Sequence, residues 1–370
     1  MRSGVAVSMG VLLTGLISSG CATGGKVKAP LAITQVSVEP KTLDLREHGQ
    51  VNIRYTLTSP ATVFIDLIDE EGRVIRQIGA GPQPAGSLTT QWDGRTAQGQ
   101  PVPGGVYRYV IRAQDAQGRQ EIYDPSGETG GEELQPHDFV FDQKTGLFRW
   151  VMPKAGRARL RVGLQGFPHL RTLLDWEPLE GGEQTFFWDG RDDSGLMNLK
   201  EHPNLSIKLS VFALPHNTII VQGNPSVPPF ALSLFPPKAD PPLAEKGLKS
   251  AAYLHAQHPR AICHEVRLHM EFPENQRYDT KGRPVLRGVV PIRITLDEKD
   301  APHLVSRRFE VAIFEDLTFL SEEEDGSNPF TYLWDTTHLP AGEHLLTINI
   351  LSYDDHYGVE TKGVVIGAPS

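Results

Sequence analysis

Side chains that commonly bind transition metals gather in one stretch of the 370-residue chain, between residues 253 and 269. Imidazole and thiolate groups are usual ligands of such metals. The group consists of His255, His258, Cys263, His264 and His269. The spacing argues against a metalloprotease site. His264-Glu265 and His269 are separated by one residue more than His-Glu-x-x-His requires, and on a helix five positions turn the second imidazole roughly 140° away.

The alternative of a strand over residues 262–272 leads to the same conclusion. His264 and His269 are an odd number of residues apart, so they would lie on opposite faces of that strand. Three of the residues stay open as a ligand set, namely His255, His258 and Cys263. We expect a structural, solvated group of histidines here, with no bound metal and no other cofactor.

Other signals of catalysis are missing from the sequence. It contains no Gly-x-Ser-x-Gly nucleophile turn, no Gly-x-x-x-x-Gly-Lys phosphate loop and no glycine fingerprint that opens a βαβ unit. The acidic stretches 189–193 and 322–326 offer oxygen ligands for a surface calcium ion, although acidic loops are more often simply solvated. We therefore predict that the protein is not an enzyme.

A tryptophan-aspartate pair occurs three times along the chain. Trp92-Asp93-Gly94-Arg95 recurs as Trp188-Asp189-Gly190-Arg191, and a third copy reads Trp334-Asp335-Thr336. Each copy follows apolar, strand-like residues and precedes a turn, which is typical of a repeated β-module. We expect each tryptophan ring to fill a sandwich core and each aspartate to bond turn amides.

Alternating apolar residues predict antiparallel strands around these pairs. Residues 51–57 alternate in the period of a half-buried strand, and residues 158–164 alternate against Arg157, Arg159 and Arg161. Glycine and proline mark the turns between such strands. The sequence predicts an all-β protein, made of tandem immunoglobulin-like antiparallel β-sandwiches after a lipoprotein signal peptide.

The first module carries a set of motifs found together in one family. They are Val63 to Asp66, Glu71-Gly72, Ala85-Gly86, the first Trp-Asp-Gly-Arg, Gly99, Val102 to Gly105 and Tyr107. With these motifs, residues 31–123 resemble the immunoglobulin-like domain of the flagellar hook-capping protein. The resemblance implies the fold but says little about function, because the module also occurs in exported bacterial proteins unrelated to flagella. Residues 329–350 resemble bacterial immunoglobulin-like spacer modules of surface proteins.

The first 21 residues predict export. Arg2 precedes an apolar run from Val5 to Ile17 that is too short to span a bilayer, and Ser18-Ser19-Gly20-Cys21 follows. This segment resembles a bacterial lipoprotein signal, which implies cleavage before Cys21 and acylation of that cysteine. Ser18 departs from the family pattern, which more often has leucine there, and an ordinary secretory signal is the alternative. Ala22 implies, by the same resemblance, the outer membrane.

The net charge of −9 excludes some partners. Nucleic acid and anionic lipid surfaces repel an acidic protein, so we predict no nucleic-acid binding and membrane contact only through the lipid. The chain has two cysteines, and if Cys21 is acylated then Cys263 has no partner for a disulfide.

The predicted organisation follows the repeats. The segments are a signal peptide (1–20), the lipidated cysteine and tether (21–30), sandwich 1 (31–124), a linker (125–143), sandwich 2 (144–235, ending in an edge strand at 230–235), a proline-rich spacer with the histidine-containing segment (236–282) and sandwich 3 (283–368).

Together these features predict a lipid-anchored, non-enzymatic scaffold or spacer of the cell envelope that binds a protein partner through its Ig-like modules. Two alternatives remain. A metal- or redox-linked accessory role would use residues 253–269, and a glycan-binding role would need exposed aromatic rings, for which Tyr107, Tyr109 and Trp176 are candidates. The sequence leaves the oligomeric state open.

Overall fold

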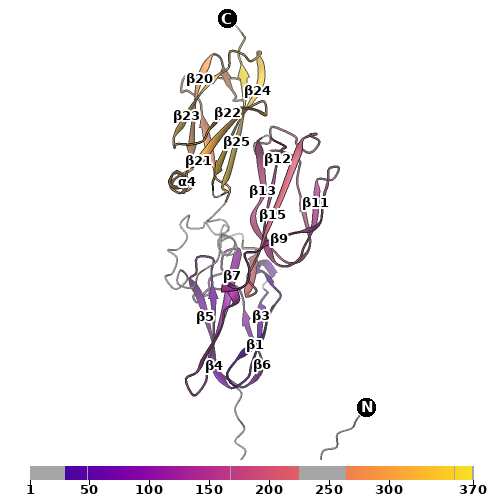
Figure 1. Cartoon of the computed structure of the whole chain (residues 1–370), viewed down its shortest axis with the longest axis vertical. Coiled ribbons are helices and arrows are strands. Elements are labelled where there is room, and N and C mark those ends of the chain that lie inside the picture. The colour runs from indigo at the N-terminus through magenta and orange to yellow at the C-terminus, as the bar shows by residue number, and fades with distance from the viewer. Residues whose placement is uncertain (1–29, 48, 167, 225–263, 354, 369–370) are drawn as a thin grey trace, which may run out of the picture.

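The computed structural model describes residues 30–224 and 264–368, apart from residues 48, 167 and 354. Cys21, His255, His258, Cys263 and the expected edge strand at 230–235 lie outside the described residues. Figure 1 shows three β-sandwiches arranged along the long axis, with the second set to one side between the other two. The prediction of an all-β, immunoglobulin-like fold is confirmed.

The first sandwich packs a small sheet in the order β1-β3-β6 against a larger sheet in the order β2-β16-β7-β4-β5, with β8 also paired to β7. Alternate residues of β3 (Val51, Ile53, Tyr55 and Leu57) are buried between the sheets, in the predicted period. The elements are β1 (Ile33–Glu39), β2 (Thr42–Asp44), η1 (Leu45–Glu47), β3 (Val51–Leu57), β4 (Ala61–Ile68), β5 (Val74–Gln83), β6 (Gly86–Trp92), β7 (Gly105–Gln114), β8 (Gln120–Tyr123), η2 (Pro125–Gly127) and β16 (Thr218–Gln222).

Strand β16 follows the second sandwich in the chain but belongs to the first sandwich. It pairs antiparallel with residues 105–108 of β7, while β8 pairs with residues 111–114 of the same strand. The two short strands therefore lie end to end along β7, and the second sandwich is inserted between them. Ile219 and Val221 of β16 are buried in the core of the first sandwich.

The second sandwich repeats this plan with a three-stranded sheet in the order β10-β11-β14 and a four-stranded sheet in the order β13-β12-β15-β9. Its core is rich in aromatic rings, and Phe148 stacks on Phe141 and on Trp188. The strands are β9 (Glu133–Leu134), β10 (His137–Asp142), β11 (Leu147–Met152), β12 (Gly156–Leu164), β13 (His169–Leu179), β14 (Gly182–Phe187) and β15 (Leu205–Ala213).

The third sandwich pairs a sheet in the order β17-β20-β23 with a six-stranded sheet in the order β18-β19-β25-β24-β21-β22. A short helix, α4 (Ala301–Arg307), precedes β21. The strands are β17 (Leu268–Glu271), β18 (Arg277–Tyr278), β19 (Pro284–Leu286), β20 (Val289–Leu296), β21 (Phe309–Glu315), β22 (Thr318–Glu323), β23 (Phe330–Asp335), β24 (Gly342–Ser352) and β25 (Tyr357–Ile366).

The strand pairing divides the chain differently from the expected segments. Strand β16 falls within the expected second sandwich (144–235) but belongs to the first, because its apolar side chains complete that core. Strands β9 and β10 fall within the expected linker (125–143) and pair into the second sandwich. Strands β17 and β18 fall within the expected spacer (236–282) and pair into the third.

The ends of the described chain lie at opposite ends of the molecule. The chain enters at the lower end of the first sandwich, and β25 leads away from the second sandwich toward the upper end (Figure 1). None of the helices in the described ranges has the length and apolar character needed to cross a membrane.

Candidate functional site

The first tryptophan-aspartate pair closes a corner of its sandwich. The Trp92 ring is 1% exposed, and its Nε1 donates a hydrogen bond to the Arg95 carbonyl at 2.9 Å. Asp93 accepts a bond from the Arg95 amide and a second from Arg76 of the opposite sheet, at 2.7 Å. Gly94 has a φ of 71°, and a Cβ there would lie 2.4 Å from the side chain of Leu45. Glycine is therefore required at this turn.

The second pair repeats these contacts. Trp188 Nε1 donates to the Arg191 carbonyl at 2.9 Å, and Asp189 accepts from the Arg191 amide at 3.0 Å. Arg171 of β13 takes the place of Arg76 and donates to Asp189 at 3.0 Å. Gly190 has a φ of 84°. The two corners thus have the same construction and a structural role.

The third pair keeps the buried ring and changes its partner. Trp334 is fully buried, and its Nε1 donates to the Glu315 carboxylate at 2.8 Å. Asp335 accepts hydrogen bonds from the Thr337 hydroxyl and amide, which lower the pKa of this carboxyl. In this copy, which lacks the Gly-Arg residues of the other two turns, a carboxylate takes the place of the turn carbonyl.

Three arginines of β12 join the sandwiches. Arg157, Arg159 and Arg161 alternate with core residues along the strand and share its outer face, yet they are only 2%, 3% and 6% exposed. The Arg157 guanidinium lies 2.8 Å from the carboxylate of Glu70, which sits in the β4–β5 turn of the first sandwich. Glu70 also accepts a hydrogen bond from the Val106 amide at 2.8 Å.

The other two arginines face the third sandwich. Arg159 donates to the Asp355 carbonyl at 2.9 Å and forms an ion pair with its carboxylate. Burial raises the pKa of the Asp355 carboxyl, but the nearby Arg159 more than offsets this and leaves that pKa lowered. The Arg161 guanidinium lies over the Tyr357 ring, 3.7 Å from its centroid. One strand therefore contacts both neighbouring sandwiches.

Trp176 completes the same face. A register irregularity between β12 and β13 accompanies a φ of 57° at Trp176, a conformation that bulky residues rarely adopt. The ring is fully buried, with the Arg159 guanidinium 4.5 Å from its centroid and the Phe212 ring at 5.3 Å. Packing on both sides stabilises this strained backbone.

Polar contacts at the joint between the second and third sandwiches are partly buried. The amide and carbonyl of His169 bond the side chain of Asn349, each at 2.9 Å. Burial, with the nearby Arg161 and Arg159, lowers the pKa of His169 to about 3. Burial, reinforced by Asp175 and Asp193 across the joint, raises the pKa of Glu265 to about 7.

Of the histidine and cysteine candidates for metal binding, His264 and His269 lie within the described residues, and His269 is exposed on β17. His264 is partly buried. Its Nε2 lies 3.0 Å from Asp300, and its ring meets the His356 ring edge to face at 4.7 Å. Across the described part of the chain, no group of three or more histidine, cysteine, aspartate or glutamate residues is arranged to hold a metal ion.

The acidic stretches are engaged in local bonds. Asp192 is 1% exposed and accepts from the Met197 amide at 2.7 Å, so it orders its own turn. Asp325 pairs with Arg308 at 3.1 Å.

The aromatic candidates for glycan stacking are buried. Tyr107, Tyr109 and Trp176 are at most 1% exposed. Burial of these rings removes the observation on which the glycan-binding alternative depended.

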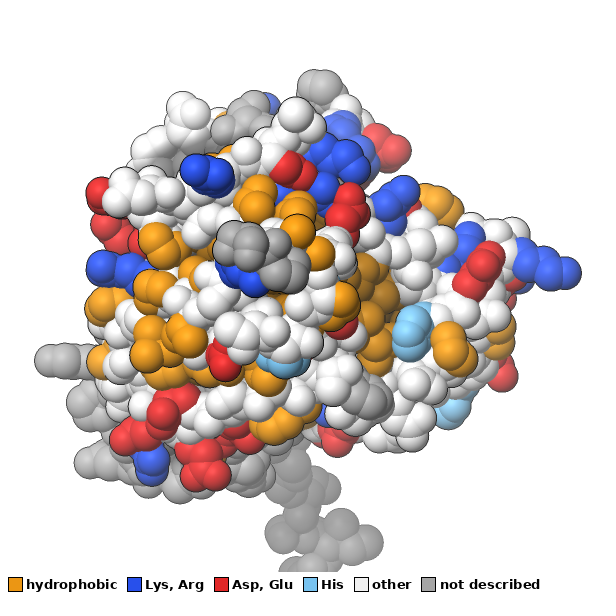
Figure 2. Space-filling view, turned by 90° about the horizontal axis from the view of Figure 1, so that it is seen from above, with side chains coloured by type: hydrophobic (Ala, Val, Ile, Leu, Met, Phe, Trp, Pro, Cys, Tyr) orange, Lys and Arg blue, Asp and Glu red, His pale blue; other side chains and the backbone are white. Residues whose placement is uncertain are grey.

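Exposed apolar side chains are scattered over the surface. Figure 2 looks onto the upper end of the molecule, where apolar side chains lie in several places across the middle and charged ones lie mainly around the rim. Val289 and Leu333, on the paired strands β20 and β23, are 60% and 63% exposed. Single exposed apolar residues are normal on protein surfaces, so they do not identify a binding site at this end.

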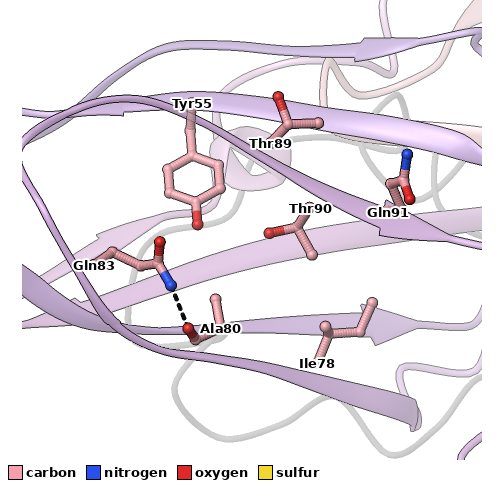
Figure 3. Close-up of a pocket in the computed structure, with 7 residues that line it drawn as sticks. All are labelled: Tyr55, Ile78, Ala80, Gln83, Thr89, Thr90 and Gln91. Carbon is pink, nitrogen blue, oxygen red and sulfur yellow. Dashed lines mark hydrogen bonds between the residues drawn. The ribbon is translucent and has the colours of Figure 1, made fainter.

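A groove of about 400 Å³ opens between strands β5 and β6 of the first sandwich. Figure 3 shows the side chains of Tyr55, Gln83 and Thr90 directed toward this space. The lining contains no charged side chain, and consists of Tyr55, Ile78, Ala80, Gln83, Thr89, Thr90 and Gln91.

Sequence reasoning missed the joints and the groove. The three arginines alternate as a solvent-facing set would, and alternation does not distinguish solvent from a neighbouring module. Three arginines in a row on one strand face, in an acidic protein, are the signal that could have indicated a joint with acidic partners.

The first sandwich has known relatives. Residues 41–117 match the family model of the FlgD Ig-like domain, which confirms the resemblance to the hook-capping protein. Ig-like modules of this type are typically non-catalytic. FlgD from P. aeruginosa is 26% identical to this chain, with 24% of this chain and 65% of that chain covered and a TM-score of 0.21. The match thus spans less than two thirds of that protein.

More distant solved structures cover more of the chain. The fibronectin(III)-like modules of Clostridium thermocellum CbhA are 9% identical over 90% of this chain and 93% of that one, with a TM-score of 0.20. A tetra-tandem repeat from the extending region of a large adhesion protein is 12% identical over 92% and 75%, with a TM-score of 0.19. No curated protein matches the chain.

Proposed function

We propose that this protein is a lipid-anchored, non-enzymatic spacer of the bacterial cell envelope, attached to the outer membrane through Cys21, and that it presents its Ig-like modules to a protein partner. The observation that carries the proposal is the arrangement of the sandwiches. They follow one another along the long axis, and the two ends of the described chain lie far apart (Figure 1).

The joints support a spacer with a defined shape. Burial of a charged or polar side chain is costly unless the group has a partner. Arg157, Arg159 and Asn349 each have a partner in a neighbouring sandwich. Such contacts oppose free rotation between modules. A spacer that keeps its length holds a binding surface at a fixed distance from the membrane.

The first described residues support an anchor at this end. The Pro30 carbonyl accepts a hydrogen bond from the Thr58 hydroxyl in the β3–β4 turn, and the Glu70 turn, which meets the second sandwich, lies at the opposite end of β4. Residues 22–30, if extended, would add about 30 Å at roughly 3.3 Å per residue.

The anchor is tested by Cys21→Ser. Several acyl chains hold a protein on a membrane stably. The variant should therefore move to the soluble fraction or accumulate as uncleaved precursor, whereas wild type partitions with detergent. Unchanged partitioning together with an unchanged mass would refute the lipid anchor.

Partner binding is tested by recovering the tagged mature protein from detergent-solubilised envelopes. We expect one reproducible protein partner, and the same recovery when His255, His258, Cys263 and His264 are all alanine. If this variant loses function and elemental analysis of wild type finds stoichiometric metal, the metal-linked role replaces the spacer. Failure to recover any partner from wild type would contradict the scaffold role.

A further inference from the structure

The outer edges of the sheets differ in how they are protected. Edge strands expose unpaired backbone groups, and charged side chains or prolines normally discourage other strands from pairing with them. Within the described residues, each sheet edge except one carries a charged side chain, such as Glu39 in β1, Arg76 in β5, Glu183 in β14 and Glu322 in β22. The exception is β6, Gly86-Ser-Leu-Thr-Thr-Gln-Trp92, which has neither a charge nor a proline within its bounds. Asp93 follows it directly, just as Asp335 ends the edge strand β23, whose other residues are also uncharged.

The unprotected edge of β6 borders the uncharged groove. Ile78 and Ala80 of β5 and Leu88 of β6 pack against the core of the first sandwich but are only partly buried. Among the described residues, the small sheet ends at β6 and no further strand covers these side chains. The space beside β6 therefore has the backbone edge and the apolar floor that one more strand would use.

A hydrogen bond crosses one end of this space. Arg76 of β5 bonds Asp93 at 2.7 Å, which links β5 to the corner after β6. Within β5 itself, the Gln83 side chain bonds the Ala80 carbonyl, which orients Gln83 along its own strand (Figure 3).

We propose that this groove binds an extended, uncharged segment of a protein partner, which adds to β6 as a fourth strand of the small sheet. The inference deepens the proposed function and rests on it, because it assigns the site and the chemistry of the partner. Main-chain hydrogen bonds to β6 supply affinity, and alternate side chains of the segment point into the groove. Those that point inward meet Ile78 and Ala80, which favours small apolar residues.

The chemistry of the lining selects among occupants. A charged residue in the groove would lose its hydration without finding an opposite charge, which is costly. A sugar ring would need an exposed aromatic face, and Tyr55, the aromatic residue of the lining, is 2% exposed. Two copies paired symmetrically through β6 would have antiparallel β6 strands, so their long axes would point in opposite directions. Their N-terminal anchors would then lie at opposite ends of the dimer and could not insert into the same membrane.

The test uses the mature chain and a displayed library of random heptapeptides as the probe. Thr90→Lys places an ammonium group in the groove, and Thr89→Lys adds a charge to the exposed edge. Thr185→Lys is the matched control. Thr185 is an exposed residue of β14, three positions before Trp188, just as Thr89 is an exposed residue of β6, three positions before Trp92. Unchanged unfolding midpoints of all three variants confirm that they fold.

We expect the selected peptides to be uncharged, with alternating apolar residues. Both β6 variants should bind them at least about tenfold more weakly, equivalent to the loss of about 1.4 kcal/mol, while Thr185→Lys binds as wild type does. The proposal is overturned if no peptide is enriched, if the enriched peptides are charged, or if they bind all variants equally. Self-association that Thr89→Lys abolishes, or polysaccharide binding that Thr90→Lys abolishes, would overturn it in favour of those occupants.

The same variants separate this proposal from the proposed function. If envelope recovery succeeds with wild type and Thr185→Lys but fails with Thr89→Lys, both stand. If all three recover the partner, the groove is not the site and the scaffold role remains. If wild type recovers none, the scaffold role itself fails.

Discussion

The Arg157 guanidinium and the Glu70 carboxylate lie 2.8 Å apart, and both side chains are buried where the first two sandwiches meet. Because both side chains are shielded from water, each charge is stabilised mainly by the opposite charge of the other. The relationship makes the first joint sensitive to the loss of one partner and tolerant of the loss of both.

Arg157→Met or Glu70→Gln alone should each destabilise the protein by about 3–5 kcal/mol, because the remaining charge stays buried without its partner. The double variant should recover most of that loss. Urea unfolding monitored by tryptophan fluorescence measures both effects. The exposed pair Arg54 and Glu39 is the control, and Arg54→Met should cost less than about 1 kcal/mol. Equal effects at the buried and exposed pairs would contradict the joint.

Ile219→Ala should destabilise the first sandwich, although Ile219 follows the second sandwich in the chain. The side chain is fully buried in the first core, and truncation of such a residue costs about 2–5 kcal/mol. Hydrogen exchange of β7 amides reports the change. Ile122→Ala, at a side chain 58% exposed on β8, should change stability by less than about 0.5 kcal/mol. If β7 amides keep their protection in the Ile219 variant, β16 does not belong to this sheet.

Glu265 should make the joint between the second and third sandwiches less stable as pH rises. Its folded pKa of about 7 lies above the ordinary 4.5, so its stabilising contribution is complete below pH 4.5 and is lost as pH rises through 7. This gap corresponds to on the order of 3 kcal/mol. His169, whose pKa is lowered to about 3, acts in the opposite sense and loses stability as pH falls below its ordinary 6.5.

Glu265→Gln separates the two groups, because His169 is common to both proteins. Between pH 4.5 and 6.5, His169 makes the free energy of unfolding rise with pH, so this rise should be clear in the variant and largely cancelled by Glu265 in wild type. Parallel curves over that range would show that Glu265 is not buried at the joint.

Arg76→Ala and Arg171→Ala should have similar effects, since the two arginines occupy equivalent places in the repeated corners. Each bonds the aspartate of its corner, at 2.7 and 3.0 Å respectively. Each loss should cost about 1 kcal/mol. Chemical unfolding of the two variants compares them directly, and a large difference would mean that the corners are alike in geometry but not in energy.

The sequence predicted the modules well because each carries its own local signals. A buried tryptophan followed by a turn, with alternating residues on either side, specifies a strand and a corner without reference to the rest of the chain. The strand at Thr218–Gln222 shows the limit of such signals. We expected these residues within the second sandwich, but the sheet they join belongs to a core whose other residues lie more than a hundred positions earlier.

The arginines of β12 show a second limit. Alternation assigns residues to two faces, and it gives no information on whether the outer face meets water or another module. Glu70 and Asp355, which pair with these arginines, are distant in sequence and ordinary in type. Only the folded arrangement brings them together. The groove beside β6 was missed for a related reason, since an edge strand and a central strand have the same alternation.

Strands β8 and β16, which pair with different parts of β7, are made at different times during synthesis. Residues 30–123 emerge first but lack β16, so the first sheet stays incomplete until Thr218–Gln222 has been made. The inserted sandwich contains all of its own strands within residues 133–213 and is complete before that point. The middle module should therefore acquire its native structure first. The module nearest the N-terminus, which begins to emerge earliest, has to wait for the returning strand.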